Sequence, residues 1–322
     1  MSDLQTVQKR ATIIVSEGMT EIYPDSPHVA LGAIPNFRRK VFRHEHHLLP
    51  MKMQSGPKAM TENNLWGGQQ HRSDMADEKD IEIARKMIEK SSKIAVLTGA
   101  GISVDSGIPD FRSEGGLWER YDPHEYATYE SFLRNPTKFW EMGQELAEVF
   151  LKAKPNEAHM ALAELERRSN LLGIITQNID NLHQTAGSKR VVELHGSFLR
   201  AYCLECNTEY VGEAIHQRVA NGEIPPKCDK CAGVLKSEAV LFGEPMPETA
   251  MSEAIGICRA ADLMIVIGSS LTIYPAAFLP QLAKNSGARI ILVNLEGTNR
   301  DNIADVVLRG RASEIVPRII GV

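Results

Sequence analysis

The sequence predicts an α/β protein with a parallel sheet, helices on both faces of that sheet, and a small second module. Five short apolar runs each fit one buried strand. Helical patterns lie between most of these runs, and strands that alternate with helices are typical of a parallel sheet covered on both faces. Two close pairs of cysteines interrupt the alternation between residues 203 and 231, which predicts the second module.

The first regular elements are expected from residue 77 onward. The stretch DEKDIEIARKMIEKS places Ile81, Ala84 and Ile88 on one helical stripe, with acidic residues in its first turn. The run KIAVLTGAG follows it and predicts a short buried strand that ends in glycines. Further strands are expected at 171–178, 191–196, 263–270 and 289–296, and helices at 136–152, 157–168, 248–259 and 275–285.

Residues 1–76 have a different character, because they show no sustained helical or strand period. The cluster RHEHHL within them offers metal ligands, but no second cluster of ligands frames a coordination geometry. We therefore expect 1–76 to be a poorly ordered N-terminal extension and 77–322 to be the folded domain.

The composition excludes several classes of protein. The 322 residues are 43% hydrophobic, enough for a sizeable core, and the net charge of −5 gives no general argument for binding nucleic acid or an anionic membrane. No apolar run approaches the roughly 20 residues of a membrane span. Five cysteines are too few for a disulfide scaffold of this size. The sequence therefore predicts a cytoplasmic protein with a metal site.

The stretch GAGISVDSGIPDFR begins directly after the first predicted strand. Gly99 and Gly101 leave the backbone open to a phosphate group at this position. The fingerprint of a dehydrogenase requires a third glycine where this chain has Val104, so that class is disfavoured. The continuation is too polar for a simple turn and too rich in glycine and proline for a helix. It predicts a mobile flap that offers Asp110 and Arg112 to a ligand.

The two cysteine pairs have the spacing of a zinc site, Cys-x2-Cys, then 21 residues, then Cys-x2-Cys. Four thiolates close the coordination sphere of the metal and leave no position for substrate, so the zinc is expected to be structural. Its ligands are Cys203, Cys206, Cys228 and Cys231. The fifth cysteine, Cys258, lies in a helical pattern and is expected in the core.

Polar or small residues follow several of the predicted strands. Open α/β sheets bind ligands at the carboxyl ends of their strands, so these residues together predict a large polar ligand such as a dinucleotide. His195 follows the strand VVEL and offers a general base, although a lone histidine is also a common structural residue. The other residues at strand ends are Gln177, Asn178, Asp180, Gly268, Ser269, Ser270, Asn294, Leu295 and Glu296.

These motifs give the chain a resemblance to the sirtuins, the silent-information-regulator family of NAD-dependent protein deacylases. The matching pieces are GAGISVDSGIPDFR, TQNIDNLH, ELHG, the two CxxC pairs, VLFGEPMP, GSSL and VNLE, which follow the order of the family over about residues 82–322. The resemblance implies a Rossmann-like domain with a zinc module inserted at about 200–235. It also implies that NAD and an acyl-lysine peptide meet in the cleft between them.

The resemblance assigns roles to individual residues. His195 and Asn178 are the implied catalytic residues. The implied peptide-binding residues are Val240, Phe242, Gly243 and Glu244. The implied NAD-binding residues are Gly99, Ala100, Gly101, Ser103, Asp110, Phe111, Arg112, Gln177, Asn178, Asp180, Gly268, Ser269, Ser270, Asn294, Leu295, Glu296 and Ala312.

The resemblance also implies a reaction. The acyl oxygen attacks the anomeric carbon of NAD as nicotinamide leaves, and His195 then takes a proton from the ribose hydroxyls. Water completes the release of free lysine and an acyl-ADP-ribose. NAD is consumed as a co-substrate, and the partners are acetylated proteins or peptides. We expect a monomer that binds neither nucleic acid nor membrane.

Departures from the family pattern bear on the acyl group. Members that prefer succinyl-lysine carry a tyrosine and an arginine, three residues apart, where this chain has Gly143 and Leu146. The missing cation predicts a preference for acetyl and longer apolar acyl groups. Two smaller departures are the family's GTSL, here GSSL, and a proline replaced by Ser237.

Two alternatives from other functional classes stay open. A mono-ADP-ribosyltransferase would use the same NAD residues. A non-enzymatic zinc ribbon that binds nucleic acid would need a basic, aromatic face. The stretch between Cys203 and Cys231 carries five acidic residues beside three basic ones, which disfavours the zinc ribbon.

Overall fold

The computed structural model describes residues 76–110, 116–168 and 171–322. Phe111 and Arg112, two of the predicted NAD-binding residues, lie outside the described residues, as does the extension up to residue 75. Among the described residues, no helix is both long and apolar enough to cross a membrane.

A six-stranded sheet forms the larger part of the fold, and all its neighbouring strands are parallel. The strand order β3-β2-β1-β7-β8-β9 places the first strand in the middle. The order reverses between β1 and β7, so a crevice for ligands is expected at their carboxyl ends. The strands are β1 (Ile94–Thr98), β2 (Leu171–Thr176), β3 (Val191–Glu193), β7 (Leu263–Ile267), β8 (Arg289–Asn294) and β9 (Val306–Arg309).

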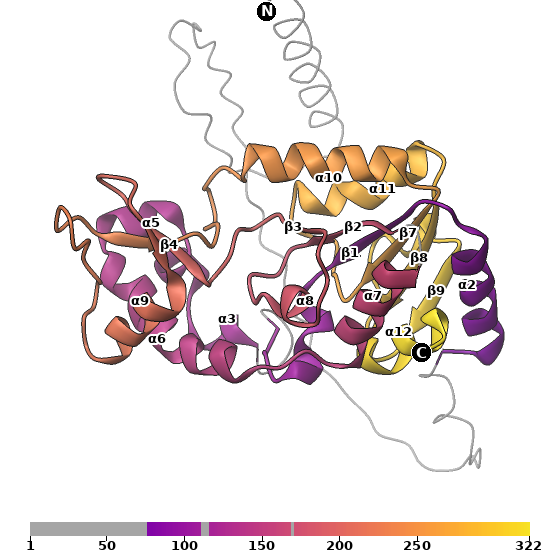
Figure 1. The fold of residues 1–322 in the computed structure, drawn as a ribbon, viewed down its shortest axis with the longest axis horizontal. Coiled ribbons are helices and arrows are strands. Elements are labelled where there is room, and N and C mark those ends of the chain that lie inside the picture. The colour runs from indigo at the N-terminus through magenta and orange to yellow at the C-terminus, as the bar shows by residue number, and fades with distance from the viewer. Residues whose placement is uncertain (1–75, 111–115, 169–170) are drawn as a thin grey trace, which may run out of the picture. The chain divides into compact units, whose positions relative to one another are not determined.

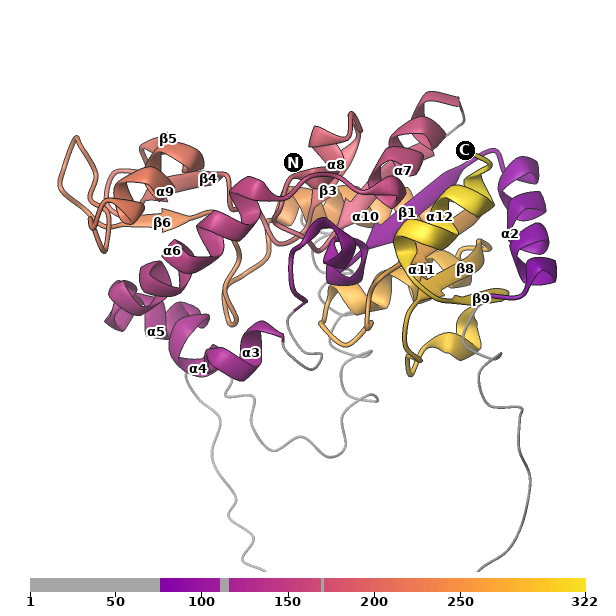
Figure 2. The same cartoon turned by 90° about the horizontal axis from the view of Figure 1, so that it is seen from below.

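Helices cover both faces of this sheet, as Figures 1 and 2 show. Alternate residues of β1 point to opposite sides, so Ile94 and Val96 enter one core and Ala95 and Leu97 the other. The first core is closed by α2 (Glu78–Lys90), α7 (Glu157–Arg168) and α12 (Ala312–Ile320). The second is closed by α10 (Glu248–Ala260) and α11 (Leu279–Asn285). The predicted fold class is confirmed.

A smaller unit contains a three-stranded antiparallel sheet in the order β5-β4-β6. Four helices from an earlier part of the chain pack against it, and their aromatic residues supply much of the shared core. Trp140 is fully buried there and donates from Nε1 to the carbonyl oxygen of Leu235 at 3.0 Å. The elements are α3 (Leu117–Arg120), α4 (Pro123–Tyr126), α5 (Tyr129–Arg134), α6 (Pro136–Lys152), β4 (Arg200–Cys203), β5 (Glu209–Val211), α9 (Gly212–Ala220) and β6 (Leu235–Ser237).

The observed strands end earlier than their sequence patterns suggest. β2 ends at Thr176, β7 at Ile267 and β8 at Asn294, two or three residues before the predicted ends. The polar residues at these points therefore lie in loops. Within the glycine-rich loop, 100–102 and 104–106 form two 3-10 turns, η1 and η2, which the sequence pattern did not predict.

Glycines allow the loop after β1 to lie directly on the loop after β7. The N–H of Gly101 donates to the carbonyl oxygen of Gly268 at 2.9 Å. A Cβ atom on Gly101 would lie 2.8 Å from the Cα of Gly268. Gly268 has a φ of +61°, and a Cβ there would lie 2.4 Å from the nitrogen of Ile102. The two backbones are therefore too close for any side chain at either position.

We predict that Gly101→Ala destabilises the protein by about 1–3 kcal/mol, because the methyl group meets backbone that cannot move aside without disturbing the sheet. Gly256→Ala is the matched control, since Gly256 lies on the exposed face of α10 and nothing lies within 4 Å of the new Cβ. There, alanine should stabilise by roughly 1 kcal/mol. Urea unfolding without ligand measures both variants. Equal stability of the Gly101→Ala variant and the wild type would contradict the close contact.

Candidate active site

The loops after four neighbouring strands meet at one edge of the large sheet. The N–H of Gly99 donates to Ile267 O at 3.0 Å, and the N–H of Gly268 donates to Val293 O at 2.9 Å. The N–H of Gln177 donates to Thr98 O at 3.0 Å. The predicted ligand residues after β1, β2, β7 and β8 therefore lie along a single rim, on both sides of the point where the strand order reverses.

A polar cluster lies under this rim. The Ser103 hydroxyl donates to Asp180 Oδ2 at 2.7 Å, and both residues are buried. The N–H of Leu182 donates to Asp180 Oδ1 at 2.9 Å. Asn178 Nδ2 donates to Ser103 Oγ at 3.1 Å and to Gly99 O at 3.2 Å. Burial raises the pKa of the Asp180 carboxyl, and the bond from Ser103 opposes that rise. The cluster fixes the side chain of Asn178 against the glycine loop.

The orientation of His195 is set by the backbone. Its Nδ1 lies 2.8 Å from the carbonyl oxygen of Gln177. A carbonyl can only accept, so Nδ1 carries the proton and Nε2 of the neutral ring keeps a lone pair. Burial lowers the pKa of His195, and the bond to Gln177 acts in the opposite direction. The ring is therefore neutral near pH 7 and can accept a proton at Nε2.

The residue after His195 ties this loop to the predicted peptide-binding segment, residues 240–244. Gly196 has a φ of +68°, and a Cβ there would lie 2.2 Å from Glu238 O. The N–H of Val240 donates to His195 O at 2.9 Å. Phe242 bonds through both backbone groups to residues 127 and 129, at 2.9 and 3.0 Å. The segment is thus held along one side by backbone bonds.

The remaining predicted NAD-binding residues lie farther along the rim. Gln177 Nε2 donates to the buried Ser269 hydroxyl at 2.8 Å, which links the loops after β2 and β7. Ser270 is exposed, and so is Leu295, with 64% of its surface accessible. Ala312 is buried at the start of α12. Asp110 is half-buried, and its carbonyl oxygen accepts from the N–H of Leu117 at 3.1 Å.

The four predicted zinc ligands form one cluster. All four sulfur atoms lie within 4.8 Å of one another. The Cys203–Cys231 and Cys206–Cys231 separations are 3.4 Å, and Cys206–Cys228 is 3.6 Å. A tetrahedral zinc with bonds of about 2.3 Å requires sulfurs roughly 3.8 Å apart, so the cluster fits this metal. Backbone N–H groups of Glu205 and Lys230 point at two of the sulfurs, at 3.4 Å each.

The comparisons with known proteins agree with this geometry. The model of the Sir2 family matches residues 99–275. The chain belongs to the Sir2 family. The NAD-dependent protein deacylase 2 of Archaeoglobus fulgidus is 48% identical over 244 residues, which cover 76% of this chain and 96% of the relative. The NAD-dependent protein deacetylase of Caldivirga maquilingensis is 46% identical over 249 residues and is covered to 96%.

Solved structures of the Sir2 family have the same fold. One, from a study of the mechanism and regulation of Sir2 enzymes, is 47% identical with a TM-score of 0.72, over 76% of this chain and 98% of the other. Another is Sir2Af2 bound to a myristoylated histone peptide, 42% identical with a TM-score of 0.66, over 76% and 96%.

Sequence patterns missed two buried histidines of this Sir2 chain. His159 Nε2 lies 3.5 Å from Ser103 Oγ, and burial lowers the pKa of His159 to about 4. His183 Nε2 lies 2.9 Å from Thr98 Oγ1, and burial lowers its pKa well below the usual value. His159 lies on the apolar stripe of α7, where a search for apolar periodicity reads it as an interruption. The sequence signal for its burial is its position beside Ala158 and three residues before Leu162, both of which are buried on the same helix.

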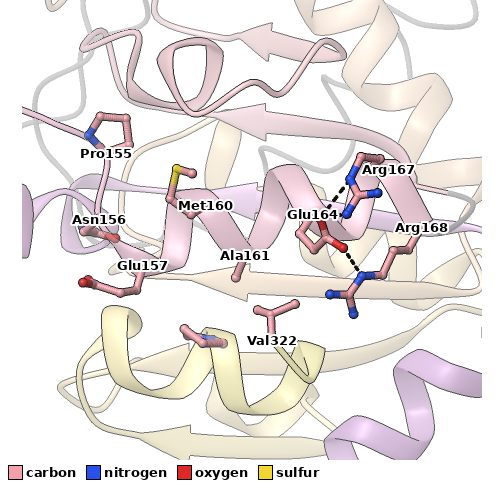
Figure 3. Close-up of a pocket in the computed structure, with 10 residues that line it drawn as sticks. Pro155, Asn156, Glu157, Met160, Ala161, Glu164, Arg167, Arg168 and Val322 are labelled. Carbon is pink, nitrogen blue, oxygen red and sulfur yellow. Dashed lines mark hydrogen bonds and ion pairs between the residues drawn. The ribbon is translucent and has the colours of Figure 1, made fainter.

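A separate hollow of about 620 Å³ lies between α7 and α12, away from the rim. Figure 3 shows Met160 on α7 and Val322 at the end of the chain among its lining residues. Glu164 is paired with both Arg167 and Arg168, so the charges of its wall are matched. None of the predicted site residues lines this hollow.

We predict one zinc ion per chain. Cys228→Ser should lose the metal and lower the melting temperature, because structural zinc contributes directly to folding. Cys258→Ala is the control, since this cysteine is buried in α10 and should leave the zinc content unchanged. Elemental analysis and thermal unfolding measure both effects. A folded, active wild-type protein without zinc would refute the assignment.

Proposed function

We propose that this Sir2-family chain removes acetyl and longer apolar acyl groups from lysine side chains of proteins, with NAD as co-substrate. Its relatives are named NAD-dependent protein deacylases or deacetylases. One observation within the chain carries the proposal. The neutral His195 ring, with its Nε2 lone pair, lies between the Asn178 cluster and the peptide-binding segment. A general base is needed where the two substrates meet.

The rim fits the size and polarity of NAD. Glycine backbone, amide groups and hydroxyls line it, and these groups bind phosphates and ribose without adding bulk. When bound, NAD supplies the ribose carbon to which the acyl oxygen becomes attached. Gln177 and Asn178 would hold the nicotinamide end. Ser269, Ser270 and Asn294 would hold the adenosine end, with Ala312 beside them.

The buried cluster supports this role for Asn178. Its amide nitrogen is already bound to Ser103 Oγ and Gly99 O, so its side-chain carbonyl points elsewhere and can accept from a ligand. Asp180 holds Ser103 in turn. We propose that Asp180 acts through Ser103 on the geometry of this amide.

We propose that an extended peptide lies along the segment 240–244. Backbone pairing of this kind gives affinity with little demand on side chains. The N–H groups of Val240 and Phe242 already bond to the protein, and that of Leu241 bonds to Glu244, so a peptide would pair with other backbone groups of the segment. Phe242 is 41% exposed, and its ring centroid lies 6.0 Å from that of Trp118. The two rings offer an apolar surface to the substrate.

We further propose that 77–322 form the catalytic domain, with the zinc module at about 200–235, and that 1–76 are an extension. A cytoplasmic location, a monomeric state and the lack of nucleic-acid binding also stay proposals from the sequence. The second candidate activity is transfer of ADP-ribose to protein. The names of the relatives favour deacylation, and product masses separate the two, because deacylation frees lysine while transfer labels the protein.

We predict that His195→Ala lowers the deacylation rate by about 10²–10⁴-fold, the usual contribution of a general base. NAD affinity should change little, because the ring bonds only to the backbone carbonyl of Gln177, whose side chain is held by Ser269. The control is His124→Ala, since His124 is exposed on α4. Steady-state rates and calorimetric NAD titration measure the two quantities. A variant with more than about a tenth of the wild-type rate would show that another group is the base.

The pH profile gives a second readout of the same assignment. The base must be neutral, so the rate falls as acid protonates it. Because burial lowers the pKa of His195, the acid limb should lie below the ordinary value of about 6.5. A limb at higher pH would contradict the orientation described above.

We predict that acetyl-lysine is used at least about tenfold more efficiently than succinyl-lysine, because an unpaired buried carboxylate costs several kcal/mol. The nearest cations have other partners. Arg120 is paired with Glu145, and Arg134 lies 4.0 Å from Glu130. The measurement compares kcat/KM for two acyl forms of one peptide. Leu146→Arg should raise the relative rate on the succinyl form. If the wild type used both forms equally well, the inference that α6 supplies no cation for an acidic acyl group would be wrong.

A further inference from the structure

Lys236 is a fully buried lysine that the sequence patterns left without a role. It lies in β6 with 1% of its surface exposed. Its ammonium group donates to Ser237 O at 2.9 Å, to Ala239 O at 3.0 Å and to Glu244 Oε2 at 2.9 Å. All three protons of the ammonium group are therefore used. Every acceptor belongs to residues 237–244.

Glu244 forms the other end of this arrangement. Its side chain is 14% exposed, and Oε2 also accepts from the N–H of Leu241 at 2.9 Å. The N–H of Glu244 donates to Leu241 O at 3.0 Å. The ion pair thus joins Lys236, which precedes the peptide-binding segment, to Glu244 at its end, and it closes residues 236–244 into a loop. Val240 and Phe242, whose N–H groups bond to His195 O and Ala127 O, lie inside this loop.

The ion pair is anchored to the sheet of the smaller unit. Lys236 on β6 lies opposite Tyr202 on β4, and its ammonium nitrogen lies 5.7 Å from the centre of the Tyr202 ring. Burial raises the pKa of Tyr202 to about 12, and the Glu244 carboxylate acts in the same direction. Tyr202 directly precedes Cys203, a predicted zinc ligand. The shape of the segment therefore depends on the sheet that carries Cys203.

We propose that Lys236 is a positioning residue for the acyl-peptide substrate. It holds residues 237–244 in the conformation that accepts the peptide, and it acts through Ala239 O and the Glu244 carboxylate without touching the substrate. This rests on the proposed function. Removing one partner of a buried ion pair leaves an uncompensated charge, so the segment would rearrange to bring Glu244 to water. Peptide binding would suffer, while the NAD rim, held by contacts of its own, would not.

Kinetics with an acetyl-lysine peptide test the proposal. Lys236→Met should raise the peptide KM at least about tenfold, with kcat and the KM for NAD within about threefold of wild type. Lys236→Arg, which keeps the cation, should recover most of the affinity. Glu244→Gln, which keeps an acceptor, should have a smaller effect in the same direction. Lys284→Met is the matched control. Lys284 lies on α11, and its Nζ lies 2.6 Å from Asp305 Oδ2 in an ion pair that does not involve residues 237–244.

Hydrogen exchange gives a readout that does not depend on activity. In the Lys236→Met variant, the amides of Val240 and Phe242 should exchange at least about tenfold faster than in the wild type. Amides of β1 and β7 should keep their protection, and the zinc content should stay unchanged.

The outcomes distinguish a failure of the positioning role of Lys236 from a failure of the proposed deacylase function. An inactive wild type would overturn the function, and faster exchange confined to the segment would still support the positioning role. An active wild type with an unchanged peptide KM in the Lys236→Met variant would overturn the positioning role alone. Equal rises in both KM values, with faster exchange throughout the protein, would also overturn it, because they indicate general loss of stability.

Discussion

The contact between two glycine backbones, Gly101 and Gly268, is the constraint on which the rest of the site depends. It forms where the strand order reverses, between β1 and β7. Because no side chain separates the loops, the turn after Gly101 brings Ser103 under the rim, where it meets Asp180 and Asn178. Gly99 and Gly101 are expected from the sequence to leave room for a phosphate. The structure adds a second reason for both glycines, because a Cβ on either would lie 2.8 Å from the backbone of Gly268.

Most polar groups of the cluster below this contact have a defined partner, and the buried Nδ1 of His183 is an exception. Burial favours the neutral forms of His159 and His183, and neutral imidazoles can accept from or donate to hydroxyls such as Ser103 and Thr98 without a counter-ion. Asp180 is the exception, since its carboxyl is buried against a hydroxyl and a backbone N–H rather than a cation. Hydrogen bonds from a hydroxyl and a backbone N–H, rather than an ion pair, thus hold Asp180 in the buried cluster under the rim.

The sequence allowed most of the large sheet to be predicted, because buried parallel strands are continuous apolar runs. β9 was missed, since VVLR is short and lies among polar residues. The role of α3–α6 could not be read from periodicity, because their aromatic residues pack against a sheet encoded far downstream. The cysteine cluster and the rim were predictable from spacing and position. Lys236 was not, because burial of a lysine depends on partners that only the folded segment supplies.

The chain passes repeatedly between the large sheet and the smaller unit, which are built from interleaved stretches (Figure 1). Leu194 packs in a core of the sheet, while the ring of Phe198 contacts Phe150 and stacks on His216 of the smaller unit, so His195 lies on one crossing. Leu241 and Met246 pack on opposite sides of another, so the peptide-binding segment lies there. A hinge between the two units would run through both. Because the N–H of Val240 bonds to His195 O, a change in the angle would carry His195 and Val240 together and would shift both relative to the rim of the large sheet.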